Sequence, residues 1–131
     1  MSQENLEVTR RAYAALQRDD IDAFLAYVHP DAEWHSLVLE MEGTFHGHDG
    51  VREWWSSLRA VFPDWAPSLV ETRDLGEHVL AHASATASAR ESGVGIDENF
   101  WQAVELRDGL VVWYAAFRTE AEALEAVARR A

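Results

Sequence analysis

Five polar side chains in this sequence have types suited to holding a small molecule, and they come from segments far apart in the chain. Tyr13, Ser36, Gln102 and Tyr114 carry hydroxyl or amide groups, which donate and accept hydrogen bonds. Arg118 adds a guanidinium, which can clamp an anionic group. These groups predict recognition of polar atoms on a ligand, with no carboxylate among them to act as a general base.

Alternation along the predicted strands puts these side chains on the same side as large apolar residues, Phe24 among them. The predicted pocket residues are Tyr13, Trp34, Ser36, Trp54, Leu58, Gln102, Val104, Tyr114 and Arg118. Such a set either lines an apolar cavity or fills a core, and the aromatic side chains by themselves favour the core. A buried amide such as Gln102 needs a hydrogen-bond partner, which a ligand can supply. Arg118 can equally pair with a glutamate at the surface.

The six histidines raise the question of a metal site, most visibly at His46 and His48. These two residues flank a glycine, and no third ligand follows at a spacing typical of zinc sites. The position of His48 beside Asp49 is explained by the start of a helix. Alternation turns His82 away from the pocket if the alanines of its strand face inward. We therefore expect no metal and no cofactor.

The elements that must position these residues begin with helices. Apolar residues at spacings of three and four predict a helix over 2–18. Asp20 is typical of a helix N-cap and predicts a short second helix that stops before Pro30. A third helix over 49–62 has a broad apolar face and ends before a proline.

Alternation with a period of two predicts strands for most of the remaining chain. One strand begins at Ala32, and a loop over 43–47 follows it. Four more strands are predicted at 68–73, 79–90, 99–107 and 110–118, the last two joined by an Asp-Gly pair that favours a tight hairpin. A capping box over 119–122 predicts a C-terminal helix with Leu124 and Val127 facing inward.

Helices followed by a meander of strands predict an α+β fold. We expect a single domain, residues 1–131, built on a cone-shaped, curved antiparallel sheet. The N-terminal helices are expected to cover the concave face of this sheet, and a short C-terminal helix to end the chain.

Composition limits the classes of function. The 131 residues are 48% hydrophobic, which is enough apolar surface to exclude a disordered chain. The formal charge is −12 and every basic residue is arginine, so the surface repels nucleic acids and anionic lipids. There is no cysteine, no signal-peptide pattern and no apolar run near the roughly 20 residues that span a bilayer. We expect a soluble, cytoplasmic protein with neither a nucleic-acid nor a membrane partner.

Five short motifs, by their order and spacing, resemble the SnoaL-like (polyketide cyclase-like) branch of the nuclear transport factor 2-like superfamily. These motifs are Asp20–Phe24, Pro30–His35, Phe45–Val51, Ser92–Asp97 and Arg107–Gly109. The resemblance covers nearly the whole chain and implies the α+β cone. It implies no single reaction, because the superfamily includes polyketide cyclases, ketosteroid isomerases, dehydratases, epoxide hydrolases and small binding proteins.

By the same resemblance, the acids of the best-known enzymes are replaced in this chain. The general-base aspartate of ketosteroid isomerases falls on Ser36, and their second pocket acid falls on Gln102, whose amide can still donate a hydrogen bond. Their pocket tyrosine lies near Tyr13. The aspartate of polyketide cyclases falls on Ala116. The resemblance therefore gives less support to these two chemistries than to the fold.

A second apolar face is predicted on the outer side of the last two strands. It consists of Trp101, Ala103, Trp113, Ala115 and Phe117. Monomers rarely expose so large an apolar patch, and members of the superfamily commonly pair through this side of the sheet. We therefore expect a homodimer.

Three functions stay open on the sequence alone. The chain is a cofactor-independent isomerase, cyclase, dehydratase or hydrolase acting on a small hydrophobic molecule, a non-catalytic binder of such a molecule, or a dimeric interaction module with a filled cone. The first needs a pocket acid or base, and the acids that would supply one by turning inward are Glu33, Glu40, Glu42, Asp97 and Glu98.

Overall fold

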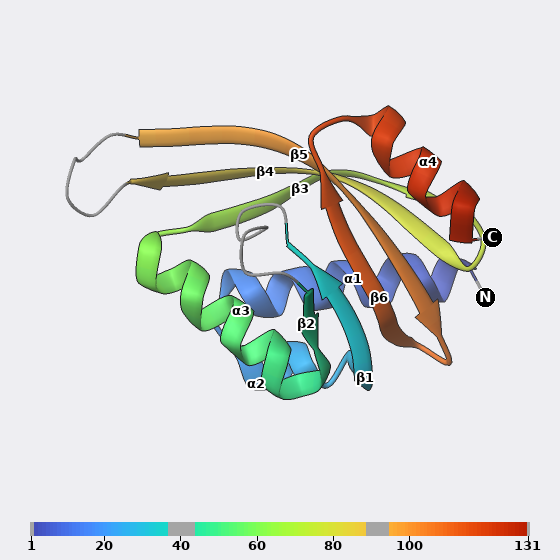
Figure 1. Cartoon of the computed structure of the whole chain (residues 1–131), viewed down its shortest axis with the longest axis horizontal. Coiled ribbons are helices and arrows are strands. Elements are labelled where there is room, and N and C mark those ends of the chain that lie inside the picture. The colour runs from blue at the N-terminus through green and yellow to red at the C-terminus, as the bar shows by residue number, and fades with distance from the viewer. Residues whose placement is uncertain (1, 37–43, 89–94, 131) are drawn as a thin grey trace.

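The computed structural model describes residues 2–36, 44–88 and 95–130, which form four helices and six strands (Figure 1). In chain order the elements are α1 (Ser2–Gln17), α2 (Ile21–Leu25), β1 (Val28–His35), β2 (Thr44–His46), α3 (Gly47–Val61), β3 (Ala66–Asp74), β4 (His78–Ser88), β5 (Gly95–Arg107), β6 (Leu110–Phe117) and α4 (Glu120–Arg130). The fold is α+β, as the order of helical and strand patterns predicted.

The strands form one curved, open sheet in the order β2-β1-β6-β5-β4-β3. All neighbours pair antiparallel except β1 and β6, which run parallel, so the prediction of a wholly antiparallel sheet was wrong at this pair. Parallel neighbours need a long connection, and here α3 and four strands separate β1 from β6 along the chain. The pairing brings the segment around Trp34 beside the segment around Tyr114.

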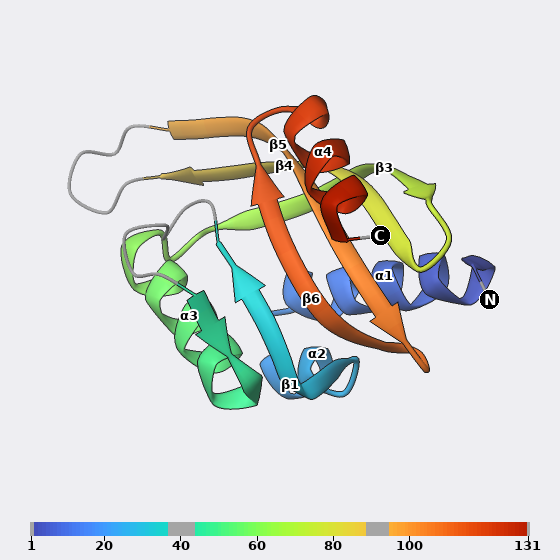
Figure 2. The same ribbon diagram turned by 45° about the vertical axis from the view of Figure 1, so that its right-hand side comes forward.

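The helices lie on both sides of this sheet. Figures 1 and 2 show α1, α2 and α3 on the concave side and α4 on the opposite side, across β5 and β6. The main core lies between the first three helices and the sheet, and a smaller cluster lies beneath α4. In α3, Val51, Trp54, Trp55 and Leu58 are buried at helical spacing, which fixes that helix over the sheet.

Most predicted elements are present, with shifted bounds. Asp20 caps α2 by accepting a hydrogen bond from the backbone N–H of Ala23 at 3.1 Å. The Asp108-Gly109 turn has φ values of +51° and +77°, the left-handed conformations that a tight hairpin turn requires. The short strand β2 occupies part of the predicted loop, and β1 begins four residues before Ala32.

Gly47 begins α3 two residues earlier than predicted, for a reason visible in the backbone. Its φ is +66°, and a side-chain Cβ there would lie 2.8 Å from the carbonyl oxygen of Pro30. Only glycine allows the chain to approach β1 this closely. In the motif around Ser92, residues 92–94 lie outside the described residues.

Of the two residues of the C-terminal helix predicted to face inward, Val127 does so and Leu124 does not. Thr119 caps it by accepting a hydrogen bond from the N–H of Glu122 at 3.2 Å. Ala123 and Ala126 are buried and Val127 packs beside them, whereas Leu124 is 36% exposed. Among the described helices, none is long and apolar enough to cross a membrane.

Candidate functional site

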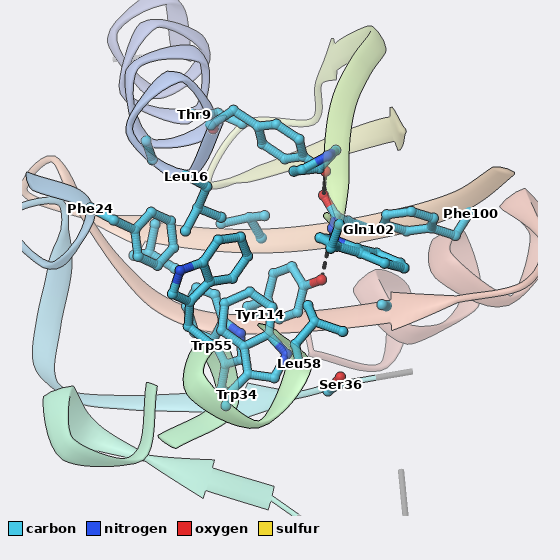
Figure 3. A pocket seen from close by; sticks show the side chains of 18 residues that line it. Thr9, Leu16, Phe24, Trp34, Ser36, Trp55, Leu58, Phe100, Gln102 and Tyr114 are labelled. Carbon is cyan, nitrogen blue, oxygen red and sulfur yellow. Dashed lines mark hydrogen bonds between the residues drawn. The ribbon is translucent and has the colours of Figure 1, made fainter. Parts of the chain in front are cut away.

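A cavity of about 70 Å³ lies between α1, α3 and the concave face of the sheet (Figure 3). Its walls are mostly aromatic and aliphatic side chains with a few polar groups among them. The lining residues are Thr9, Ala12, Tyr13, Leu16, Phe24, Trp34, Ser36, Trp54, Trp55, Leu58, Trp65, Pro67, Phe100, Gln102, Val104, Val111, Tyr114 and Ala116. A water molecule needs about 10–15 Å³ and drug-sized ligands occupy about 300–1,000 Å³, so the space suits a compact molecule.

The parallel pairing of β1 with β6 builds one wall of the cavity. Trp34 and Tyr114 are partners in the register, and their rings stack at 4.3 Å with an interplanar angle of 16°. Phe24 meets the edge of Trp34 at 5.6 Å, and Trp54 from α3 lies 5.4 Å from it. These contacts hold the Trp34 ring from three sides, so the aromatic wall is rigid.

A hydrogen-bonded chain of three side chains crosses the cavity. Tyr13 from α1 donates its hydroxyl proton to Oε1 of Gln102 at 3.0 Å, and Nε2 of Gln102 donates to the hydroxyl of Tyr114 at 2.7 Å. Figure 3 shows the two bonds in line across the space. Gln102 is thus satisfied by protein groups on both ends of its amide, and a ligand is not needed to explain it.

Burial sets the protonation state of both tyrosines. It raises the pKa of Tyr13 well above its ordinary value, with a further increase from Tyr114 that the hydrogen bond to Gln102 only partly offsets. Burial likewise raises the pKa of Tyr114, against the lowering effect of its bond to Gln102. Both hydroxyls therefore stay neutral at physiological pH and act as hydrogen-bond donors or acceptors, not as bases.

Among the described residues, Trp34 supplies a buried donor without an acceptor, and Tyr114 keeps a proton that its bond to Gln102 does not use. Trp34 is 2% exposed, and its Nε1–H has no acceptor among the described residues. The hydroxyl of Tyr114 accepts its bond from Gln102, so its own proton points away from that amide. A buried donor without a partner costs about 1–3 kcal/mol, a cost that a ligand with an acceptor atom would remove.

All predicted pocket residues except Arg118 line the cavity. Arg118 is exposed, lies just beyond the end of β6 and is not among the described lining residues, so its role as an anion clamp stays a prediction. Alternation was extended one residue past the end of the strand. Three aromatic residues line the cavity without having been predicted to do so: Trp55, Trp65 and Phe100. The helical spacing that identified Trp54 also places Trp55 on the inner face of α3.

No carboxylate or imidazole belongs to the described lining. Glu33 points to the opposite side of β1, where its carboxylate binds Nε2 of His35 at 2.5 Å, and this bond lowers the pKa of Glu33. Glu40 and Glu42 lie outside the described residues, as do the side chains of Asp97 and Glu98. The described cavity thus offers hydrogen-bond donors without a general base.

The histidines have structural partners. His48 donates from Nε2 to the carbonyl oxygen of Val28 at 2.7 Å, tying the first turn of α3 to β1. His82 stacks on Trp101 at 4.3 Å and is not among the lining residues of the cavity. Within the described ranges, no group of three or more histidine, aspartate or glutamate side chains is arranged to hold a metal ion.

The outer face of the sheet is covered by the chain's own C-terminal helix. Trp113, Ala103 and Ala115 are 6%, 0% and 4% exposed because α4 packs on them. The expectation that they form a large exposed patch was therefore wrong. Trp101 and Phe117 stay partly exposed, and they are partners in the β5–β6 register.

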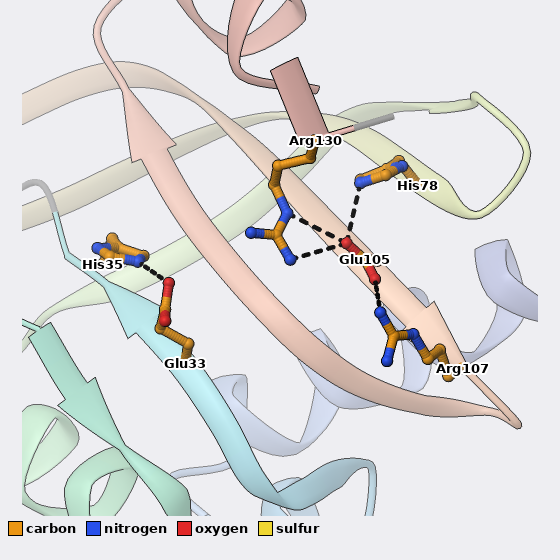
Figure 4. Close-up of polar contacts among 6 residues, drawn as sticks. All are labelled: Glu33, His35, His78, Glu105, Arg107 and Arg130. Atoms are coloured by element: carbon orange, nitrogen blue, oxygen red, sulfur yellow. Dashed lines mark hydrogen bonds and ion pairs between the residues drawn. The ribbon is translucent and has the colours of Figure 1, made fainter. Parts of the chain in front are cut away.

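A buried glutamate fastens α4 to this face (Figure 4). The side chain of Glu105 is 6% exposed, and its Oε1 accepts hydrogen bonds from Nε and Nη2 of Arg130 at 3.1 and 2.9 Å. Arg107 donates to the other oxygen at 2.9 Å, and Nε2 of His78 lies 3.3 Å from Oε1. The Arg130 guanidinium also lies 4.2 Å above the ring of Trp113.

Comparison with known proteins agrees with this architecture. A family model described as a SnoaL-like domain matches residues 9–114. A search among curated proteins found no match. Among solved structures, TerC co-crystallised with polyporic acid superposes with a TM-score of 0.80 at 22% identity, covering 93% of this chain and 96% of that one.

Two further structures extend the likeness. A protein described as a SnoaL-like polyketide cyclase, from Jannaschia sp. CCS1, has a TM-score of 0.78 at 18% identity over 95% of this chain and 90% of that one. A protein with a ketosteroid isomerase-like fold from Catenulispora acidiphila, in complex with trimethylamine, has a TM-score of 0.77 at 13% identity over 91% and 90%. At these identities the likeness shows the fold.

Proposed function

This chain belongs to the SnoaL-like domain family, and from that premise we propose that its cavity binds a compact, mainly apolar molecule carrying a hydrogen-bond acceptor. The proposal is carried by Trp34, whose side chain lines the cavity and whose buried indole N–H has no acceptor among the described residues. The proton of Tyr114 is a second donor beside it. A carbonyl oxygen has two lone pairs and can accept hydrogen bonds from two donors.

Binding is favoured over acid–base catalysis by the chemistry of the described lining. The titratable groups there are Tyr13 and Tyr114, and burial keeps both neutral. A hydroxyl held at raised pKa polarises a carbonyl by hydrogen bonding, but it does not remove a proton from carbon. The cofactor-independent isomerase, cyclase, dehydratase or hydrolase is the second candidate, favoured by the Tyr13–Gln102–Tyr114 chain, whose end group is placed to polarise a carbonyl.

Cyclohexanone and methylenecyclohexane test the binding proposal, because they have nearly the same shape and differ in a C=O against a C=CH₂ group. We expect cyclohexanone to shift the indole N–H resonance of Trp34 saturably and to bind roughly 2- to 10-fold more tightly than methylenecyclohexane. Tyr114→Phe should reduce this preference. Tyr27→Phe, which removes a hydroxyl outside the cavity lining, should not. Equal binding of both probes, or no effect on Trp34, would refute the proposal.

The same probe separates binding from catalysis. In deuterium oxide an enzyme that enolises ketones would exchange the α-protons of cyclohexanone faster than buffer does. We expect no acceleration by this protein, because the described lining lacks a base to take the proton. Acceleration that disappears in Tyr114→Phe would instead establish the second candidate.

The homodimer stays a prediction, now supported only by the partly exposed pair Trp101 and Phe117. Size-exclusion chromatography with light scattering tests it at micromolar concentration. A dimer that dissociates in Phe117→Asp would agree with a contact at this pair. A monomeric wild-type protein would refute it.

A further inference from the structure

We infer that ligands reach the cavity through a passage at the end of the β1–β6 ladder, where Ser36 and Ala116 separate the cavity from a surface groove beside α4. The inference rests on the proposed function, since it concerns how a ligand enters the cavity. It also assigns a role to Ala116, whose small side chain would set the rate of ligand exchange.

The interior cavity and the surface groove share two lining residues. Ser36 and Ala116 line the interior cavity, and they also line the groove on the α4 side of the sheet. The groove has a volume of about 360 Å³ and is lined further by His35, Trp113, Ala115, Phe117, Ala126, Arg129 and Arg130. Among the residues described for the two hollows, this pair alone belongs to both.

The register explains why the wall is thin there. Trp34 pairs with Tyr114 and His35 pairs with Ala115, after which β1 ends. Side chains alternate between faces, so Ser36 and Ala116 follow the stacked rings of Trp34 and Tyr114 on the cavity side. At the level of Trp34 and Tyr114, two large aromatic rings separate the cavity from the groove. At the next level only the hydroxymethyl group of Ser36 and the methyl group of Ala116 do so.

A molecule that passes between Ser36 and Ala116 crosses at the end of the ladder, one residue beyond its last register pair, His35 and Ala115. Ala12 is an equally small residue that lines the cavity. It lies buried in α1 and does not line the groove. Ala116 thus lies at the proposed passage, whereas Ala12 belongs to the cavity wall alone and serves as a control.

The side of the passage that faces α4 is held in a fixed shape. Arg130, one of the groove residues, is bonded to Glu105 and lies over the ring of Trp113 at 4.2 Å. Trp113 is itself buried, so the floor of the groove is part of the folded core beneath α4. The groove can thus act as a preformed vestibule, and side chains at its inner end determine how fast a ligand exchanges.

Exchange kinetics of cyclohexanone test the inference, measured by relaxation dispersion at the Trp34 indole. We expect Ala116→Val, and independently Ser36→Thr, to slow association and dissociation together by roughly tenfold, the effect of forcing added methyl groups into a narrow gap. Both residues also line the cavity, so the dissociation constant should rise as well, but by much less than the association rate falls. The matched control Ala12→Val narrows the cavity without touching the passage, so it should raise the dissociation constant with little change in association rate.

Each alternative result has one meaning. If Ala116→Val and Ser36→Thr change affinity but leave the association rate unchanged, the two residues are ordinary cavity lining and the inference is wrong. If Ala12→Val slows exchange as much as they do, the passage does not lie at the end of β1. If cyclohexanone fails to bind the wild-type protein, the proposed function fails and the inference falls with it.

Discussion

Replacing Glu105 by glutamine should weaken the attachment of α4 to the sheet, while the shape of the side chain at position 105 stays almost unchanged. The substitution removes one buried charge that accepts two hydrogen bonds from Arg130 and one from Arg107. Hydrogen bonds to charged groups contribute about 1.5–3 kcal/mol, and neutral ones about 0.5–1.5 kcal/mol. The Arg107 side chain is 70% exposed, so its hydrogen bond to Glu105 contributes little to stability. The Arg130 side chain is only 34% exposed, so its hydrogen bonds to Glu105 contribute more.

The expected cost of Glu105→Gln is therefore about 1–2 kcal/mol of unfolding free energy at pH 7. For a domain of this size that corresponds to a fall in Tm of about 4–8 °C. Glu125→Gln is the matched control on α4, because Glu125 is 67% exposed and bonded only to the exposed Arg129. It should change the unfolding free energy by less than about 0.5 kcal/mol.

The pH dependence of the stability difference between wild type and Glu105→Gln shows whether the charge of Glu105 causes it. Burial alone would raise the pKa of the Glu105 carboxyl, but the hydrogen bonds and charge of Arg130, with smaller effects of His78 and Arg107, hold it below the ordinary value of 4.5. A folded-state pKa below the unfolded one stabilises the protein fully above the unfolded pKa, and the stabilisation is lost as pH falls through the folded value.

Urea unfolding followed by circular dichroism, at pH 7 and at pH 3, measures both effects. Wild type and Glu105→Gln should differ at pH 7 and be closer in stability at pH 3, because the stabilisation by Glu105 is lost as pH falls below 4.5 and through its lowered folded-state pKa. A difference that is the same at both pH values would refute an electrostatic origin. A cost equal to that of Glu125→Gln would show that Glu105 does not fasten α4.

Three further substitutions test other parts of the fold. Leu58→Ala removes a lining side chain that is 1% exposed, so it should cost about 2–4 kcal/mol in urea unfolding and admit the two-ring ketone 1-tetralone in a fluorescence titration. Gly109→Ala places a side chain at a φ of +77° and should cost about 1 kcal/mol. Asp20→Ala removes the cap of α2 and should also cost about 1 kcal/mol, and its loss should be additive with that of Gly109→Ala in a double variant.

The predictions from sequence succeeded where a local signal has one physical meaning. The face of α3 follows from helical spacing, because Val51, Trp54, Trp55 and Leu58 are too large to be left in water. The β5–β6 hairpin follows from Asp108-Gly109, because few residue pairs adopt two successive positive φ values. Alternation also placed Gln102 and Tyr114 on the face of the sheet that the helices cover.

The predictions failed where the outcome depends on which element covers a surface. Alternation placed Trp113 on the outer face correctly, but it carries no information about the partner of that face. The partner is α4, which lies close to the sheet because Ala123 and Ala126 are small. The larger Leu124 was predicted to face inward and does not. The parallel pairing of β1 with β6 is likewise a long-range contact that no local pattern encodes.

The charge distribution narrows the chemistry of the acceptor that the proposed ligand presents. The chain has a formal charge of −12, and the described lining contains no arginine, since Arg118 lies at the surface. A carboxylate in this cavity would lose its hydration and meet only neutral donors, which costs several kcal/mol more than the burial of a carbonyl. The acceptor is therefore expected to be neutral, a ketone, ester or ether oxygen, and cyclohexanecarboxylate should bind far more weakly than cyclohexanone at pH 7. If the carboxylate bound as tightly, a cation would have to reach the cavity, and the assignment of Trp34 and Tyr114 as its principal donors would be wrong.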